Sequence, residues 1–201
     1  MNAEGLCYLH YFERAFQKIS SVRGDIVECG VFRGRTFLML AYLTFQRQKK
    51  FSRILWGFDS FQGLPRPAAE DRSFRKPKKG KFGNTTAEKV AERLNALGFQ
   101  KALRARRIRL IPGFFNQSLK QFPNRPIAFL HVDCDLYRSH LEVLTTLFPQ
   151  IARGGIISFD DHHNSHWPGA RKAIDEYFNG SSHQISYDKV AKKYFVVKKR
   201  T

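Results

Sequence analysis

Short apolar runs alternate with longer stretches of helical periodicity along most of this chain. We expect strands over residues 25–29, 53–58, 107–111, 127–132 and 155–159. Helices are expected over 36–46, 85–97, 138–148 and 168–179, with Thr85 or Thr86 as a cap and Gly98 as a stop. This alternation is typical of βα units, which build a parallel sheet covered by helices on both faces.

The C-terminal stretch departs from this pattern. Residues 183–187 and 193–197 are apolar runs separated by a short polar turn, too short for a helix. They are expected to pair as an antiparallel hairpin, which gives a seven-stranded, mostly parallel sheet. The 201 residues suit one domain, 1–201, with an N-terminal helical segment over 1–20 and a mobile basic loop over 66–84.

The charge of the chain is strongly positive. Its 35 Lys and Arg residues face 17 Asp and Glu, a formal net charge of +18. Such a field attracts nucleic acid, an anionic membrane or a phosphorylated substrate, although it is equally explained by solubility. No apolar stretch reaches the length of a membrane span, and Cys7, Cys29 and Cys134 lack metal-type spacing. We therefore expect a cytoplasmic protein with reduced cysteines.

Two of the apolar runs end in pairs of carboxylates. Asp133 and Asp135 follow the run 127–132, and Asp160 and Asp161 follow 155–159. Neighbouring parallel strands would bring these acids together at one edge of the sheet. Carboxylates that share a small volume require shifted pKa values or a cation, and an all-oxygen set suits Mg²⁺.

Two other interpretations of this region stay open. The nearby His162, His163 and His166 are potential zinc ligands, but their H-H-x-x-H spacing is not that of a known zinc site. Asp135 is also well placed to cap the helix that begins near Tyr137, which would explain one acid without a metal.

Residues that suit a nucleotide-like ligand follow the first two strands. The segment E-C-G-V-F-R-G (28–34) is a glycine turn, without the spacing of a dinucleotide or P-loop motif. In G-F-D-S-F-Q-G-L-P (57–65), Asp59 stands where α/β proteins hold ribose hydroxyls, and Phe61 is a candidate for stacking on adenine. The alternative for the second segment is a plain turn acid and a core phenylalanine.

Six segments together resemble the macrocin O-methyltransferase (tylosin-type) family. They are V-E-C-G-V-F-R-G, G-F-D-S-F-Q-G-L-P, G-F-F-N-Q-S-L, L-H-V-D-C-D-L-Y, G-G-I-I-S-F-D-D and G-A-R-K-A-I-D-E-Y, spread over about residues 20–180. The resemblance implies the Rossmann-like class I fold of S-adenosylmethionine (SAM)-dependent methyltransferases. It also implies dependence on Mg²⁺ and methylation of a hydroxyl on a glycosidic or other polyhydroxylated small molecule.

The resemblance also assigns roles by position. The cofactor would be bordered by Glu28, Gly30, Asp59, Ser60, Phe61, Gly113, Phe114 and Asp133. The metal ligands would be Asp133, Asp160 and Asp161. Asp135 is the first candidate for the general base, with His140 and His162 as rivals.

The chain departs from the family pattern at Arg35, Arg138 and His162, of which the last two flank the expected site. The six basic residues between Arg72 and Lys81 favour an anionic acceptor. Two alternatives remain: a methyltransferase of the same fold acting on a phenol or a nucleic acid, and a non-catalytic basic domain that binds SAM or polyanions. A homo-oligomer is compatible with the sequence, and no membrane span is expected.

Overall fold

A seven-stranded sheet forms the centre of the computed structural model, which describes residues 3–47 and 51–199. Its strand order is β3-β2-β1-β4-β5-β7-β6. The strands are β1 (Asp25–Cys29), β2 (Leu55–Asp59), β3 (Ile108–Pro112), β4 (Ile127–Val132), β5 (Ile151–Phe159), β6 (Ser186–Asp188) and β7 (Lys193–Val197). The first five pair in parallel, and β7 pairs antiparallel with both β5 and β6. The chain order reverses between β1 and β4, a switch point where α/β sheets bind ligands.

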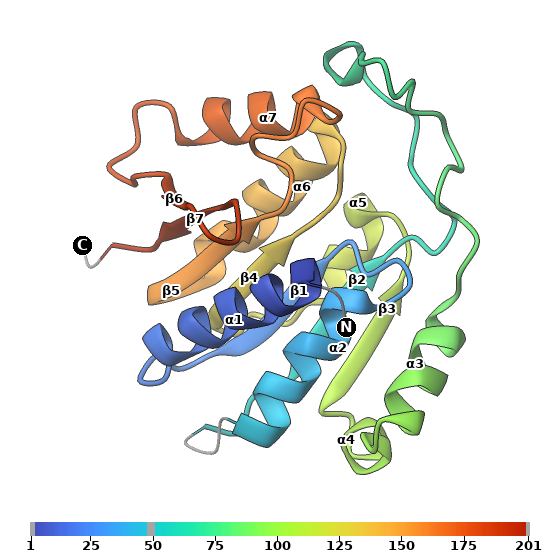
Figure 1. Cartoon of the computed structure of the whole chain (residues 1–201), viewed down its shortest axis with the longest axis vertical. Coiled ribbons are helices and arrows are strands. Elements are labelled where there is room, and N and C mark those ends of the chain that lie inside the picture. The colour runs from blue at the N-terminus through green and yellow to red at the C-terminus, as the bar shows by residue number, and fades with distance from the viewer. Residues whose placement is uncertain (1–2, 48–50, 200–201) are drawn as a thin grey trace.

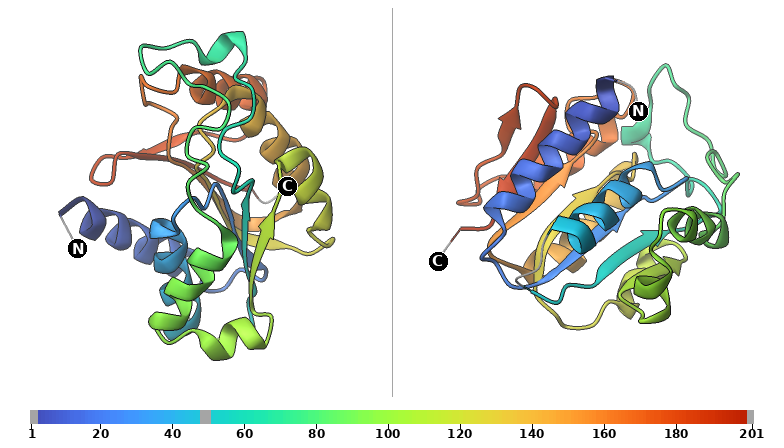
Figure 2. Two further views of the ribbon diagram at one scale, coloured as in Figure 1. Left: turned by 90° about the vertical axis from the view of Figure 1, so that its right-hand side faces the viewer. Right: turned by 60° about the horizontal axis from the view of Figure 1, so that its bottom comes forward.

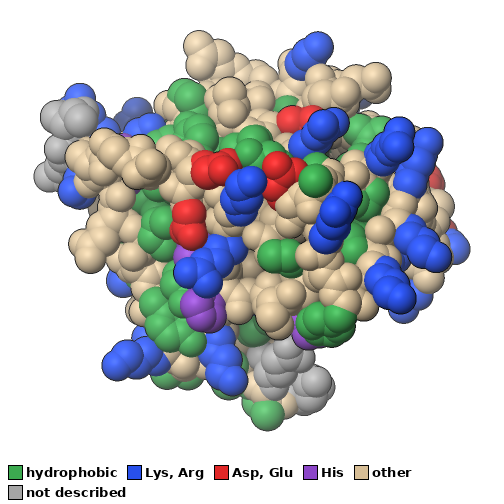
Figure 3. All heavy atoms as spheres, turned by 90° about the horizontal axis from the view of Figure 1, so that it is seen from above, with side chains coloured by type: hydrophobic (Ala, Val, Ile, Leu, Met, Phe, Trp, Pro, Cys, Tyr) green, Lys and Arg blue, Asp and Glu red, His purple; other side chains and the backbone are tan. Residues whose placement is uncertain are grey.

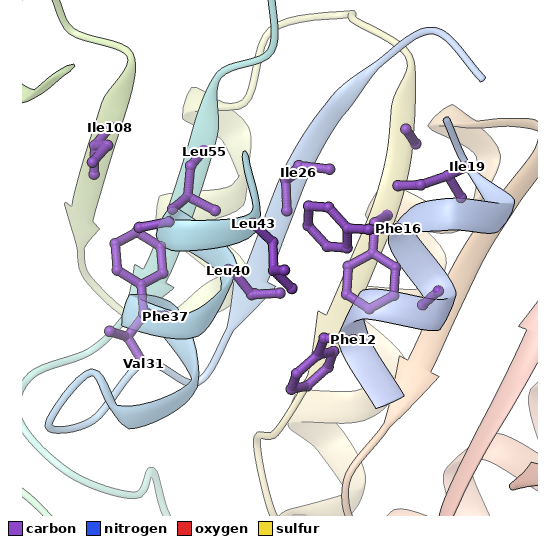
Figure 4. Close-up of a cluster of buried hydrophobic side chains, with 14 of the residues drawn as sticks. Phe12, Phe16, Ile19, Ile26, Val31, Phe37, Leu40, Leu43, Leu55 and Ile108 are labelled. Atoms are coloured by element: carbon purple, nitrogen blue, oxygen red, sulfur yellow. The ribbon is translucent and has the colours of Figure 1, made fainter. Parts of the chain in front are cut away.

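Helices cover both faces of the sheet (Figures 1 and 2). They are α1 (Ala3–Lys18), α2 (Arg35–Tyr42), α3 (Ala87–Ala96), α4 (Gln100–Arg104), α5 (Phe115–Ser118), α6 (Tyr137–Leu147) and α7 (Pro168–Phe178). On one face, Phe12 and Phe16 of α1 and Leu40 of α2 pack over Ile26 and Leu55 (Figure 4). A second cluster lies under α6 and α7. The two buried layers fix the strand ends at one edge.

The expected α/β class and the C-terminal hairpin are confirmed, and the differences from expectation have local causes. The helix expected over 36–46 is α-helical only to Tyr42 and continues as a π-helical turn over Leu43–Arg47. Strand β5 begins four residues earlier than expected, because Ile151 pairs with Ile127 across a register shift. Helices α4 and α5 were not expected; each spans five residues or fewer. None of the described helices is long and apolar enough to cross a bilayer.

The side chain of Arg53, in the loop just before β2, is buried inside the protein. Only 1% of its surface is exposed, and burial lowers its pKa. Its guanidinium donates hydrogen bonds to the carbonyl oxygens of Gly24, Ile19 and Val22 at 2.6, 2.9 and 2.8 Å. One side chain thus ties the end of α1 and the turn before β1 to the start of β2. This explains why β2 begins at Leu55.

We expect Arg53→Met to lower the free energy of unfolding by about 3 kcal/mol, because the three carbonyl groups lose their partner. Urea denaturation followed by circular dichroism measures this loss. Arg104→Met on the exposed surface of α4 is the matched control, with an expected change within about 0.5 kcal/mol. Equal losses in the two variants would contradict the role given to Arg53.

Candidate functional site

A cavity of about 520 Å³ opens at the carboxyl edge of the sheet, at the switch point. Its walls come from the ends of β1, β2, β3 and β4, from the start of α6 and from the long segment 60–86 that follows β2. Six of the eight residues expected to border a cofactor line it: Gly30, Asp59, Ser60, Gly113, Phe114 and Asp133. Glu28 lies buried beneath the cavity, and Phe61 packs against the core cluster under α1 and α2.

Gly30 permits the close approach of two strand ends. It adopts a φ of +93°, and its amide donates to the carbonyl of Phe58 at 2.9 Å. A Cβ atom at this position would overlap the carbonyl oxygen of Asp133. The amide of Asp133 in turn donates to the carbonyl of Cys29 at 2.8 Å. The glycine therefore fixes Asp133 against the end of β1.

The Asp59 carboxylate organises the turn beside Gly30. One oxygen accepts hydrogen bonds from the amides of Val31 and Phe32 at 2.8 and 2.7 Å, and the other accepts from the amide of Phe61 at 2.7 Å. This explains the left-handed conformations of Phe32 and Phe61, with φ of 47° and 51°. Asp59 is thus more than a plain turn acid: it holds two loops while it lines the cavity.

The four acids converge in two overlapping groups that share Asp133. Oxygen atoms of Asp133, Asp135 and Asp161 lie within 4.8 Å of one another. On the other side, Asp133 and Asp160 lie within the same distance of a nitrogen atom of His131. The four acids thus lie near one another, but among the described residues no group of close ligand atoms contains Asp133, Asp160 and Asp161, the three expected metal ligands, together.

The carboxylates are held close in spite of their mutual repulsion. Burial raises the pKa of Asp133, Asp135 and Asp161 well above the usual range. Neighbouring carboxylates raise each pKa further, with Asp160 contributing to all three. Such a cluster gains stability from any cation placed within it.

Lys193 supplies one positive charge to this cluster. Its side chain is 3% exposed, and its ammonium forms an ion pair with Asp160 and a 2.8 Å hydrogen bond to the Tyr8 hydroxyl. Burial opposes the charged form, but Asp160 and Tyr8 outweigh it and raise the pKa of Lys193. No local sequence pattern predicts this contact, because a lysine next to the polar turn of a hairpin is expected to face solvent.

Asp135 does not cap the following helix, so that interpretation of the sequence is wrong. The N-cap position of α6 is Leu136, and the amide of Tyr137 donates to Asp71 at 2.8 Å. Asp71 comes from the segment 60–86 and is 2% exposed. Asp135 has a φ of 60° and lines the cavity beside Asp133. Its carboxylate is therefore not used as a helix cap.

The histidines proposed as rival bases lie outside the cavity. His140 is fully buried, where its Nδ1 atom lies 3.0 Å from the Leu136 carbonyl and 3.4 Å from Cys134 Sγ, and burial lowers its pKa to about 4. The Nε2 atom of His162 lies 2.7 Å from Asp175, beside a shallower pocket at the start of α7. His166 lies 2.7 Å from Asn164. Among the described residues, no potential ligand group contains His162, His163 or His166.

The model of one protein family, the macrocin O-methyltransferases (TylF), matches residues 5–193. The chain belongs to this family.

Curated relatives include two antibiotic-pathway enzymes of this family type. A demethyldecarbamoylnovobiocin O-methyltransferase from Streptomyces niveus is 32% identical over 162 residues, which cover 79% of this chain and 59% of the relative. A mycinamicin III 3''-O-methyltransferase from Micromonospora griseorubida is 27% identical over 174 residues, covering 84% and 65%. The chain thus spans about three fifths of the length of these relatives.

Solved structures share the fold. The calicheamicin methyltransferase CalS11 superimposes with a TM-score of 0.88 over 98% of this chain and 80% of its own, at 23% identity. The O-methyltransferase NovP gives a TM-score of 0.78 at 25% identity, over 96% of this chain and 80% of its own. The class I methyltransferase fold expected from the sequence is confirmed.

In this family member, the segment 60–86 is anchored at several points. Leu64 packs with Leu136, Trp167 and Ala170, and the Ser73 hydroxyl donates to the carbonyl of His166 at 2.9 Å. These contacts to α6 and to the start of α7 place the segment over the acids, as the wall of the cavity. The mobility expected for residues 66–84 stays a prediction.

The sequence did not predict that two buried polar side chains, Glu28 and His131, lie side by side behind the acids. Glu28 and His131 are register partners on β1 and β4, and neither side chain has a hydrogen-bond partner in the described part of the chain. Burial raises the pKa of Glu28 well above its usual range and lowers that of His131 to about 4. Both groups are thus expected to be neutral, which limits the charge stored beneath the cavity.

Gly30→Ala is expected to lower the free energy of unfolding by about 3 kcal/mol or more, because backbone strain adds to a clash with Asp133. Gly98→Ala is the matched control: Gly98 has a similar φ of +88° but no atom near the added methyl group. It should cost only about 1 kcal/mol. Chemical denaturation of both variants measures the difference, and similar losses would contradict the close-approach argument.

Proposed function

We propose that this protein is a SAM-dependent and Mg²⁺-dependent O-methyltransferase that acts on a hydroxyl of a sugar or another polyhydroxylated small molecule. The convergence of Asp133, Asp135, Asp160 and Asp161 beside the glycine turn of β1 carries this proposal. The family and the relatives named above support it, since each of those relatives is named as an O-methyltransferase.

The cofactor is proposed to lie between the ends of β1, β2 and β3. Gly30 lets a ligand approach the backbone, and Asp59 presents a carboxylate that is already fixed by three amides. The Oδ1 atom accepts one of these hydrogen bonds and keeps a lone pair for a ribose hydroxyl, whereas Oδ2 already accepts two. Gly113 and Phe114 line the same part of the cavity on the β3 side. When bound, SAM supplies an electrophilic methyl group.

The carboxylates fit a hard divalent cation. Burial, together with the neighbouring carboxylates, raises the pKa of Asp133, Asp135 and Asp161, and a bound cation would offset that repulsion. We propose Asp133, Asp160 and Asp161 as the ligands: Asp133 belongs to both groups of close acids, whereas Asp160 belongs to one and Asp161 to the other. Bound Mg²⁺ would orient vicinal hydroxyls and lower their pKa. Lys193 orients Asp160, as outer partners of metal ligands do.

Asp135 is the proposed acceptor of the hydroxyl proton. It lines the cavity next to Asp133, whereas the rival bases His140 and His162 do not. Its amide hydrogen-bonds to Asp161 at 3.3 Å, which keeps the side chain beside the metal ligands. Burial raises its pKa, and a raised pKa makes a carboxylate a stronger base.

Calorimetry and methyl-transfer assays test the proposed reaction. SAM should bind the purified protein, and labelled methyl groups should appear on a panel of glycosides only when Mg²⁺ is present. Adding EDTA should abolish transfer, and excess Mg²⁺ should restore it. Absence of SAM binding would favour a non-catalytic polyanion-binding domain, and transfer that is unaffected by EDTA would remove the metal from the mechanism.

Three substitutions separate the metal ligands from the base. Asp133→Asn and Asp160→Asn should weaken Mg²⁺ binding by about tenfold or more, because each removes a charged ligand. Asp135→Asn should lower kcat by about a hundredfold or more and change Mg²⁺ affinity much less. Isothermal titration with Mg²⁺, combined with kcat, measures both. If Asp135→Asn lost the metal and Asp160→Asn kept it, the ligands would instead be Asp133, Asp135 and Asp161.

A further inference from the structure

Three exposed arginines line the cavity. Arg66 and Arg75 come from the segment 60–86, and Arg138 from the first turn of α6. In the described ranges, none of the three guanidinium groups makes an ion pair or a hydrogen bond to the protein. Their donors are therefore available to a ligand.

Some other arginines of this chain are bound by protein groups. Arg53 donates to three carbonyl groups, and Arg125 forms an ion pair with Asp25 at 2.8 Å. Arg138 acts electrostatically on Glu70, Asp71 and Glu142, but it forms no ion pair or hydrogen bond with them.

Arg75 is held by aromatic rings and not by acids. Its guanidinium carbon lies 5.2 Å from the centre of the Trp167 ring and 5.9 Å from that of Phe82. Trp167 is 5% exposed and packs with Leu64 and Leu136, so the platform itself is fixed. Lys81 adds a second cation, 5.5 Å from the Phe82 ring, and its ammonium donates to the Arg75 carbonyl at 3.5 Å. A guanidinium over a ring keeps its in-plane N–H donors free.

Both signs of charge line the cavity. Asp133 and Asp135 are partly buried in its wall, whereas the three arginines are exposed. Arg75 and Lys81 lie near enough to Asp135 to act on it electrostatically. Figure 3 shows this face of the molecule, with acidic side chains near its middle and basic side chains beside and around them. A ligand that fills the cavity therefore meets both the carboxylates and the arginines.

We propose that Arg66, Arg75 and Arg138 form a phosphate subsite, so that the acceptor is a sugar that carries a phosphate or diphosphate ester. Arginine forks match two phosphate oxygens at a time, and three of them match the two charges of a diphosphate better than one carboxylate. This inference rests on the proposed function only in taking the cavity as the acceptor site. The competing explanation is that the arginines merely balance the four acids at long range.

Calorimetric titration with inorganic pyrophosphate, without divalent metal and at fixed salt, tests the subsite directly. The wild-type protein should bind, and the combined variant Arg66→Gln, Arg75→Gln and Arg138→Gln should bind about tenfold more weakly or worse. The control combines Lys101→Gln, Arg104→Gln and Arg106→Gln, which removes the same amount of charge around α4. This helix lies at the start of β3, and the cavity lies at the other end of that strand (Figure 1). It should bind as the wild type does. No binding by the wild type, or equal weakening in both variants, would overturn the proposal.

A second titration compares a nucleoside diphosphate hexose with the methyl glycoside of the same hexose, with Mg²⁺ present. The diphosphate sugar should bind at least about tenfold more tightly, and the arginine variant should lose that preference while keeping its Mg²⁺ affinity. Equal affinity for the two sugars would overturn the subsite. Neither titration requires methyl transfer, so the result for the phosphate subsite does not depend on whether the proposed reaction occurs.

Discussion

The structure depends on keeping four carboxylates together at one edge of a buried sheet. Each isolated charge would be costly there, and the fold lowers the cost by different means around the cluster. Lys193 neutralises Asp160, and burial leaves Glu28 and His131 uncharged behind the acids. The remaining negative charge faces the cavity. The fold thus concentrates its electrostatic strain where a cation or a proton relieves it.

The positions of these acids follow from short-range sequence features. Strand β4 begins and ends where its apolar run does, and the acids lie just beyond the ends of β4 and β5. Since parallel strands place their carboxyl ends together, the convergence was predictable from the sequence. The helix cap at Thr86 was also predictable, because it depends on a contact between residues only three positions apart.

What the sequence did not predict depends on contacts between distant segments. Lys193 meets Tyr8 across 185 positions, and Asp71 takes the capping role at Tyr137 that local spacing offered to Asp135. A residue-by-residue pattern favours the nearer candidate, since it carries no information on which loop folds back. The distinction matters for chemistry: the Asp71 contact releases Asp135 from a structural role and leaves it in the cavity.

The segment 60–86 both contacts α6 and α7 and lines the cavity. Its buried residues, Leu64 and Asp71, fix it to α6 and α7, and two of its exposed basic residues, Arg66 and Arg75, line the cavity. A surface loop serving solubility alone would not need a buried carboxylate on a helix amide or an arginine stacked on a fixed tryptophan. Part of the +18 net charge therefore lies in the wall of the cavity that the acids also line. A neutral glycoside would leave those guanidinium groups without partners, whereas a phosphate ester would satisfy them and leave the sugar hydroxyls to the carboxylates.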